Sequence, residues 1–348
     1  MIHKPITEDK ITSTRKLIRE SIPITGSLLS GTYGTYPSDT NVEKFTSSHG
    51  LFESVYDYPY LSSSANHIFD LTFGVRSGSL SPAPVTQSAQ KYRIYKEMAQ
   101  TLLGFDATGS VKNFTLDGST NSNNMLFVNF SRLLTKDGVR IGTFTASMGT
   151  GSWATPFAGT LLQLSDNPST NVNNVNVDSP VGQYWYVYTG SAFASTDKVG
   201  MLFYQQGVLA LDLSKTPFAS LAYSSSVANP AGGYLSGSNL YSTGTITEVS
   251  DAFRRYVNNL NFQNTIQINS TIYHCDLGAN EFNYSSNPTY TSGSVVRVKT
   301  NFLDNSVTYI TTVGLYNDSN QLLAVAKLSE PIKKSQDDSI TIRVRLDY

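Results

Sequence analysis

The strongest constraint on the fold is the alternation of apolar and polar residues at the end of the chain. Five apolar residues alternate with four polar ones over the last nine positions: Ile340, Thr341, Ile342, Arg343, Val344, Arg345, Leu346, Asp347 and Tyr348. A period of two places successive side chains on opposite faces of a strand, whereas a helix would spread them around its axis. The pattern therefore predicts a strand with one buried and one solvated face.

Further strand signals recur from about residue 106 onward. Apolar or aromatic runs occur at 125–130, 184–188, 199–204 and 208–213, and Lys136-Asp137-Gly138-Val139 has the Asp-Gly signature of a hairpin turn. We interpret the last fifty residues as an antiparallel meander. The predicted fold class is mainly β, an antiparallel sandwich-like body with a few short helices and an extended N-terminal arm.

Three segments are candidates for helices. Residues 86–103 have apolar side chains at helical spacing and are followed by Gly104, a residue that commonly ends helices. Residues 250–260 predict a short helix, and residues 7–20 could form one polar helix. Residues 223–245 are rich in Ser and Gly and are expected to form a surface excursion.

These signals suggest three parts of the chain. Residues 1–50 form an extended arm that orders against a neighbouring subunit or stays mobile, and residues 51–105 form an aromatic segment followed by a helix. Residues 106–348 form the β-rich body, which could contain an inserted β subdomain around 145–245.

The composition excludes several functions. Ser, Thr and Asn make up 107 of 348 residues, charged residues only 15%, and the net charge is −1. A general nucleic-acid binder needs a basic face, so no nucleic-acid partner is expected. No apolar window is long enough to span a membrane, and the polar N-terminus does not look like a signal peptide. The single cysteine, Cys275, excludes an internal disulfide.

Catalytic and metal motifs are weak. The four histidines, His3, His49, His67 and His274, are scattered, and the adjacent His274 and Cys275 would point to opposite faces of a strand. The glycine-rich segment 149–153 lacks the lysine of a phosphate loop and predicts a turn. We therefore expect no catalytic residues, no metal and no cofactor, and we do not expect an enzyme.

Aromatic residues provide the candidate interaction site. Phe52, Tyr56, Tyr58 and Tyr60 lie in one dense segment and are candidates for a subunit interface, because Tyr buries area and keeps a hydroxyl for hydrogen bonding. The alternative is an ordinary edge of the protein's own core. A second hypothesis is a carbohydrate- or receptor-binding protein, for which Trp153, Trp185 and Tyr186 are the candidate residues. A third is a polysaccharide hydrolase, which needs a carboxylate pair in a cleft.

Four stretches resemble virion structural proteins of tailed bacteriophages, especially contractile-tailed phages of marine bacteria and cyanobacteria. They are residues 48–67 (SHGLFESVYDYPYLSSSANH), 201–215 (MLFYQQGVLALDLSK), 280–290 (NEFNYSSNPTY) and 313–348. The resemblance runs through most of the chain and is greatest to baseplate wedge components.

The resemblance implies a non-enzymatic building block of a phage tail or baseplate. Its partners would be other tail, baseplate or neck proteins and copies of itself in a homo-oligomer, without membrane insertion. The implied location is the virion, after assembly in the host cytoplasm. A neck or tail-terminator protein is the alternative within the same group.

Overall fold

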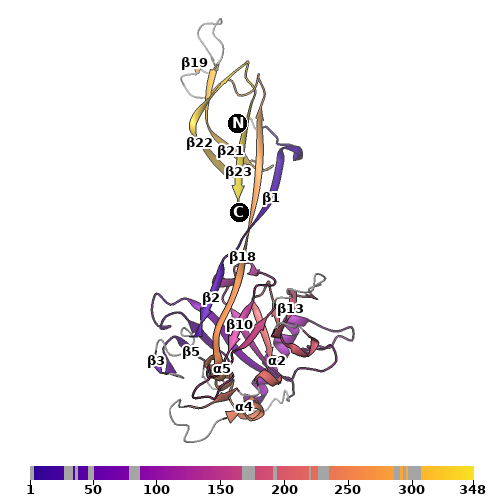
Figure 1. Cartoon of the computed structure of the whole chain (residues 1–348). Coiled ribbons are helices and arrows are strands. Elements are labelled where there is room, and N and C mark those ends of the chain that lie inside the picture. The colour runs from indigo at the N-terminus through magenta and orange to yellow at the C-terminus, as the bar shows by residue number, and fades with distance from the viewer. Residues whose placement is uncertain are drawn as a thin grey trace. The chain divides into compact units, whose positions relative to one another are not determined.

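The computed structural model gives a mainly β protein, which confirms the predicted fold class (Figure 1). It describes residues 4–26, 34–35, 38–45, 51–77, 87–166, 177–190, 194–218, 221–225, 235–285, 291–292, 295–296 and 307–348. Internal contacts divide the chain into two compact units. We call Ile18–Ile266 the central unit, and Met1–Leu17 together with Gln267–Tyr348 the terminal unit.

The helices and strands follow in chain order. The helices are the 3-10 turns η1 (Glu8–Lys10), η2 (Ser195–Asp197) and η3 (Thr216–Phe218), and the α-helices α2 (Gln87–Leu103), α3 (Arg132–Thr135), α4 (Gly237–Thr243) and α5 (Ile246–Tyr256). The strands in the first half are β1 (Ile11–Ile18), β2 (Ser21–Thr25), β3 (Gly34–Thr35), β4 (Ser38–Asp39), β5 (Val42–Lys44), β6 (Glu53–Tyr56), β7 (His67–Val75), β8 (Asn124–Phe130), β9 (Gly138–Val139), β10 (Thr145–Met148) and β11 (Leu162–Ser165). The remaining strands are β12 (Val177–Ser179), β13 (Gly182–Thr189), β14 (Lys198–Phe203), β15 (Val208–Asp212), β16 (Ala222–Tyr223), β17 (Leu235–Ser236), β18 (Val257–Leu277), β19 (Thr291–Ser292), β20 (Val295–Val296), β21 (Val307–Tyr316), β22 (Leu322–Ser335) and β23 (Ile340–Asp347).

The central unit is built on one antiparallel sheet. Its strand order is β18-β10-β11-β13-β14-β15-β8-β7-β6-β5, with β2 and β9 also paired to β18 and β12 paired to β13. Consecutive strands are mostly neighbours, as expected for hairpin connections. The predicted strands at 125–130, 184–188, 199–204 and 208–213 are confirmed as β8, β13, β14 and β15.

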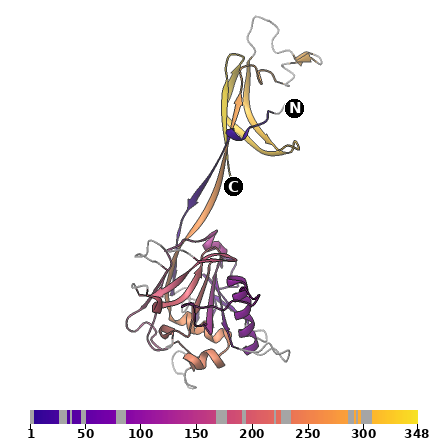
Figure 2. The ribbon, with the colours of Figure 1, turned by 90° about the vertical axis from the view of Figure 1, so that its right-hand side faces the viewer.

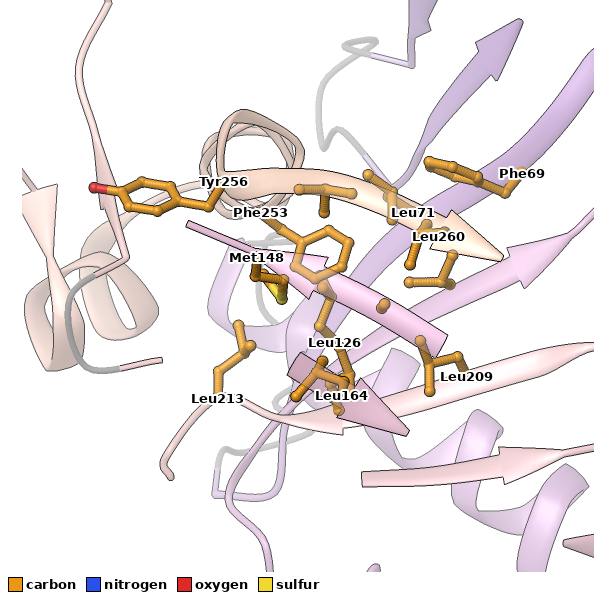
Figure 3. Packing of buried hydrophobic residues seen from close by; sticks show 14 of the residues in the cluster. Phe69, Leu71, Leu126, Met148, Leu164, Leu209, Leu213, Phe253, Tyr256 and Leu260 are labelled. Carbon is orange, nitrogen blue, oxygen red and sulfur yellow. The ribbon is translucent and has the colours of Figure 1, made fainter. Parts of the chain in front are cut away.

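Both faces of the middle strands are buried, which explains their continuous apolar runs. On β8, Leu126 and Val128 face the main core, which includes Phe253 and Leu260, while Met125 and Phe127 face a second core beneath α2. Figure 3 shows the main core, where side chains from β7, β8, β10, β18 and α5 meet. The sheet is therefore covered on one face by α2 and packs its other face into the main core (Figure 2).

Helix α2 confirms the prediction for residues 86–103, although Thr86 lies outside the described residues. Gly104 has φ +75°, so the helix ends in the left-handed conformation that favours glycine. Gly74 of β7 lies under the helix, and a Cβ there would come within 2.6 Å of the Tyr95 amide nitrogen. This close approach requires glycine and fixes α2 against the sheet.

The terminal unit confirms the C-terminal alternation. In β23, Ile342 and Val344 are buried, while Thr341, Arg343 and Arg345 are exposed. β23 pairs with the second half of β18 from Ser270 to Leu277, and β21 pairs with β22 as a separate antiparallel hairpin. The predicted meander is therefore wrong at its last step, because β23 joins β18 and not β22.

Three other local predictions are wrong. Residues 7–20 form η1 and strand β1, since the β-branched residues of this segment pair with β18 and tertiary pairing outweighs weak helix propensity. The Asp-Gly segment is preceded by helix α3, and its Gly138 and Val139 pair with β18 instead of closing a hairpin.

The short helix expected at 250–260 is present, with shifted bounds. It is α5, Ile246–Tyr256, which begins four residues earlier because Thr245 and Glu248 form a capping box. The third wrong prediction is the surface excursion at 223–245, because Leu240 and Tyr241 of α4, within this range, are buried.

The two compact units do not follow the boundaries expected at residues 50 and 105. Strand β2 from the expected arm pairs with β18 from Asn259 to Gln263, and β7 from the aromatic segment pairs with β8 of the expected body. Pairing between distant segments therefore defines the units, and the central unit contains both expected boundaries.

Candidate interaction surfaces

The aromatic segment at 52–60 divides into a packed part and an exposed part. Phe52 stacks on Phe45 with ring centroids 4.2 Å apart, and Tyr56 lies between the rings of Tyr60 and His67 at 6.4 and 5.5 Å. Burial, followed by the nearby carboxylate of Glu43 that the Tyr56 hydroxyl contacts, raises the pKa of this phenol. Phe52 and Tyr56 therefore hold the turn in place through contacts within the protein.

The exposed part is the turn between β6 and β7. Tyr58 is 48% exposed, Tyr60 36% and Leu61 86%. The turn itself is ordered, because Asp57 accepts hydrogen bonds from the backbone and side-chain amides of Asn66 at 2.6 and 2.9 Å. We call Tyr58, Tyr60 and Leu61 the aromatic turn. It presents apolar groups on a fixed backbone, which suits contact with another molecule.

Leu61 was not among the residues predicted from the sequence. Its position directly after the Tyr-Asp-Tyr-Pro-Tyr run, where a turn was expected, is the signal that could have identified it, since a large apolar side chain at a turn has little core to enter.

A second exposed apolar surface lies on strand β22 of the terminal unit. Leu322, Leu323 and Val325 are 52%, 67% and 58% exposed, and we call them the β22 patch. Among the described residues β22 pairs only with β21, so its outer edge presents unpaired backbone groups. An exposed apolar edge strand is prone to pair with another chain unless something covers it.

The β22 patch borders a large groove within the terminal unit. The groove has a volume of about 1050 Å³ and lies between residues 4–11, the end of β18, the β21–β22 hairpin and β23. Its walls include Tyr273, Leu315 and Ile342. The meander predicted for the last fifty residues includes this strand, but the sequence does not indicate that its apolar residues remain exposed.

Charged side chains gather in the interior of the central unit. The Arg254 guanidinium on α5 binds the carboxylates of Asp39 and Asp251, the latter at 2.7 Å, and Lys44 donates to Asp251 at 2.5 Å. Glu53 is fully buried, and its nearest cation, the Lys44 amine, is 3.7 Å away. Burial, followed by repulsion from Asp251, raises the pKa of Glu53 to about 8.

The contacts of this charged cluster suit a structural role more than a catalytic one. Arg254, Asp39, Asp251 and Glu53 are between 0 and 5% exposed, and none of them lines the groove of the terminal unit or the cavity of about 280 Å³ beside strand β13. The ion pairs connect α5 to strands β4, β5 and β6. The acidic residues therefore do not form the open carboxylate pair that a polysaccharide hydrolase would need.

Two other buried ionisable groups also have structural partners. Lys91 of α2 donates to the carbonyls of Tyr241 and Gly244 at 2.9 and 2.5 Å, which caps the end of α4, and burial lowers the pKa of this amine to about 8. Asp166 accepts hydrogen bonds from the Tyr204 hydroxyl and from two backbone amides of the 142–144 turn, while burial raises its pKa to about 6.

The residues proposed for sugar stacking do not form a platform. Trp153 is only 2% exposed and packs edge-on against Tyr223 at 5.9 Å. Trp185 packs against the main core and its indole nitrogen is buried, while the Lys198 amine covers the Tyr186 ring at 3.8 Å. The glycine-rich segment at 149–153 is a tight turn, since a Cβ on Gly149 would lie 2.2 Å from a carbonyl oxygen.

The described part of the chain contains no group of three or more His, Cys, Asp and Glu side chains that could hold a metal ion. None of the helices in this part is long and apolar enough to cross a membrane. His3 and His49 lie outside the described residues, whereas His67 bonds Asp70 at 2.8 Å.

Comparison with known protein families, curated proteins and solved structures finds no match to this chain.

Proposed function

We propose that this chain is a non-enzymatic structural subunit of a phage tail, stationed in the baseplate, whose terminal unit docks on neighbouring subunits. The observation that carries the proposal is the β22 patch, in which three large apolar side chains remain more than half exposed on an edge strand. Soluble proteins rarely leave such a strand uncovered.

The packing of the terminal unit supports the same proposal. Among its described residues only four apolar side chains are buried, Ile272, Leu315, Ile342 and Val344, and each retains 5 to 8% exposure. Burial of apolar area is the main source of folding free energy. A unit with so little internal burial gains stability when a partner covers it.

The composition and the aromatic turn add to this support. Few charges and many Ser, Thr, Asn and Tyr residues suit wet, hydrogen-bonded contacts between subunits. The stretches at 48–67 and 313–348 that resemble phage virion proteins contain the aromatic turn and the β22 patch respectively. A neck or tail-terminator station is the alternative.

The first experiment is to purify virions of the phage that encodes this chain and to search them for it by mass spectrometry. We expect the chain in several copies per particle, and a reconstruction of the tail should place it in the baseplate. Absence from the particles contradicts the proposal, and density at the neck favours the alternative station.

The second experiment tests the docking surface. Leu323→Asp places a charge in the β22 patch, and Thr311→Asp is the matched control because Thr311 is an exposed residue of the same hairpin outside the patch. We expect particles carrying Leu323→Asp to lack the subunit while Thr311→Asp assembles normally. Equal assembly of both variants, each with an unchanged thermal melt, contradicts the role of the patch.

A further inference from the structure

We propose that residues 4–10 form a strap that closes one side of the groove in the terminal unit and opens while the rest of the unit stays folded. This side of the groove, whose volume is about 1050 Å³, is lined by Lys4, Pro5, Ile6, Thr7 and Lys10. The closed strap keeps other chains away from the apolar walls and is therefore an autoinhibitory contact. The inference concerns contacts within the terminal unit and does not depend on the assembly role.

The strap makes few contacts along its length. Of residues 4–10, Ile6 and Lys10 are half-buried and the other five are exposed. Within the described part of the chain, no backbone hydrogen bond joins residues 4–7 to the rest of the terminal unit. Strand β1, which begins at Ile11, is instead paired with β18. The segment before β1 can therefore leave the groove while β1 keeps its pairing.

An ion pair holds each end of the strap. The Lys4 amine pairs with the Glu281 carboxylate, and the Lys10 amine lies 2.9 Å from the Asp276 carboxylate. All four side chains are between 37 and 44% exposed. Both carboxylates also accept a hydrogen bond from the body of the unit, at 2.7 and 2.6 Å, so they stay in position when the strap leaves. Exposed ion pairs contribute little and are screened by salt, which makes the closure reversible.

Ile6 is the apolar anchor of the strap. Its side chain packs against the buried cluster of Leu315, Ile342 and Val344. Cys275 of β18 packs against the same cluster and lines the groove, and it lies directly opposite Ile342 in the pairing of β18 with β23. Residues opposite each other in an antiparallel pair share one face of the sheet. Opening of the strap therefore removes Ile6 from the cluster and exposes the groove around Cys275.

Cys275 serves as the probe of opening, because it is the single cysteine of the chain and is half-buried. The test measures the rate at which iodoacetamide alkylates the full chain, followed by intact-mass spectrometry. Iodoacetamide is small and uncharged, so the charges of the strap do not steer its approach. When the thiol reacts from the open state, the rate follows the population of that state. Added salt should accelerate the reaction, because it screens both ion pairs.

Two variants of the strap should also accelerate the reaction. Ile6→Ala removes most of the apolar anchor and should raise the rate about tenfold. Lys4→Gln removes one exposed ion pair and should raise the rate about threefold. Leu17→Ala and Lys16→Gln are the matched controls, since both residues are exposed on β1 and neither lines the groove. We expect both controls to react at the wild-type rate.

Faster alkylation of the two strap variants, with both controls unchanged, supports the strap. Equal rates for the wild type and the strap variants overturn it, and so does equal acceleration of strap variants and controls. A wild-type rate that does not respond to salt also overturns it, because the ion pairs then do not hold the strap. If Ile6→Ala alters the thermal melt, Lys4→Gln decides the question, since Lys4 is exposed. Each of these results leaves the assembly test of the β22 patch untouched.

Discussion

Strands β8 and β22 show how differently the two units use the same antiparallel pairing. On β8, Met125, Leu126, Phe127 and Val128 are completely buried, because α2 covers one face and the main core covers the other. On β22, Leu322, Leu323 and Val325 are apolar to a similar degree yet more than half exposed. Apolar sequence thus marks a strand in both units, and the layers around the strand decide whether it belongs to a core or to a surface.

The difference has a physical consequence for the two units. The central unit buries most of its large apolar side chains within itself, so we expect it to be stable by itself. The terminal unit buries few apolar side chains among its described residues and exposes several others. Its stability should therefore depend on whether anything covers its exposed apolar residues.

The largest expected effect is a cavity in the central core. Phe130 contacts Phe69 edge-on at 6.2 Å and Phe262 at 4.9 Å. Phe130→Ala should destabilise the protein by about 3–5 kcal/mol, measured by urea unfolding. Leu133→Ala is the control, since Leu133 is 60% exposed and its loss should change stability by less than about 0.5 kcal/mol. Similar losses for both variants would contradict the assignment of the core.

A smaller effect is expected in the thin core of the terminal unit. Ile342→Asp buries an unpaired charge on β23 and should cost about 2–4 kcal/mol. Arg343→Ala, on the exposed face of the same strand, should be nearly neutral. Thermal melts of both variants test the face assignment, and equal tolerance of the two substitutions would refute it.

The pH dependence of stability tests the buried charges. Glu53 keeps its proton up to about pH 8 in the folded protein but loses it near its ordinary pKa of 4.5 when unfolded. The folded state binds the extra proton between these values, so this group makes the unfolding free energy fall as pH rises, by up to about 1.4 kcal/mol per pH unit.

The control for this prediction is Glu53→Gln. It should flatten the slope between about pH 4.5 and 8 in denaturant titrations, even if its overall stability differs. Lys44, Asp251 and Arg254 surround Glu53 and remain in the variant. An unchanged slope would mean that Glu53 does not titrate in this range.

The smallest expected effect concerns the β22 patch. Leu323→Ala should change the stability of the isolated chain by less than about 0.5 kcal/mol, because the side chain is 67% exposed and contributes little to the fold. A loss above about 1 kcal/mol in thermal melts would show that Leu323 packs within its own chain, and it would remove the contrast with β8.

The local features of this fold follow from the amino-acid sequence alone. Period-two alternation specified the faces of β23, helical spacing followed by Gly104 specified α2, and continuous apolar runs specified the middle strands of the central sheet. These signals are strong because they depend on backbone geometry within a few residues.

The other features depend on tertiary contacts. The segment expected to form an N-terminal helix pairs with β18 as strand β1, and Gly138 pairs with β18 instead of forming a hairpin turn. Packing placed Trp153 in the core and left Leu61 and the β22 patch exposed. Each of these outcomes depends on contacts between residues far apart in the chain, which a local pattern of residues does not encode.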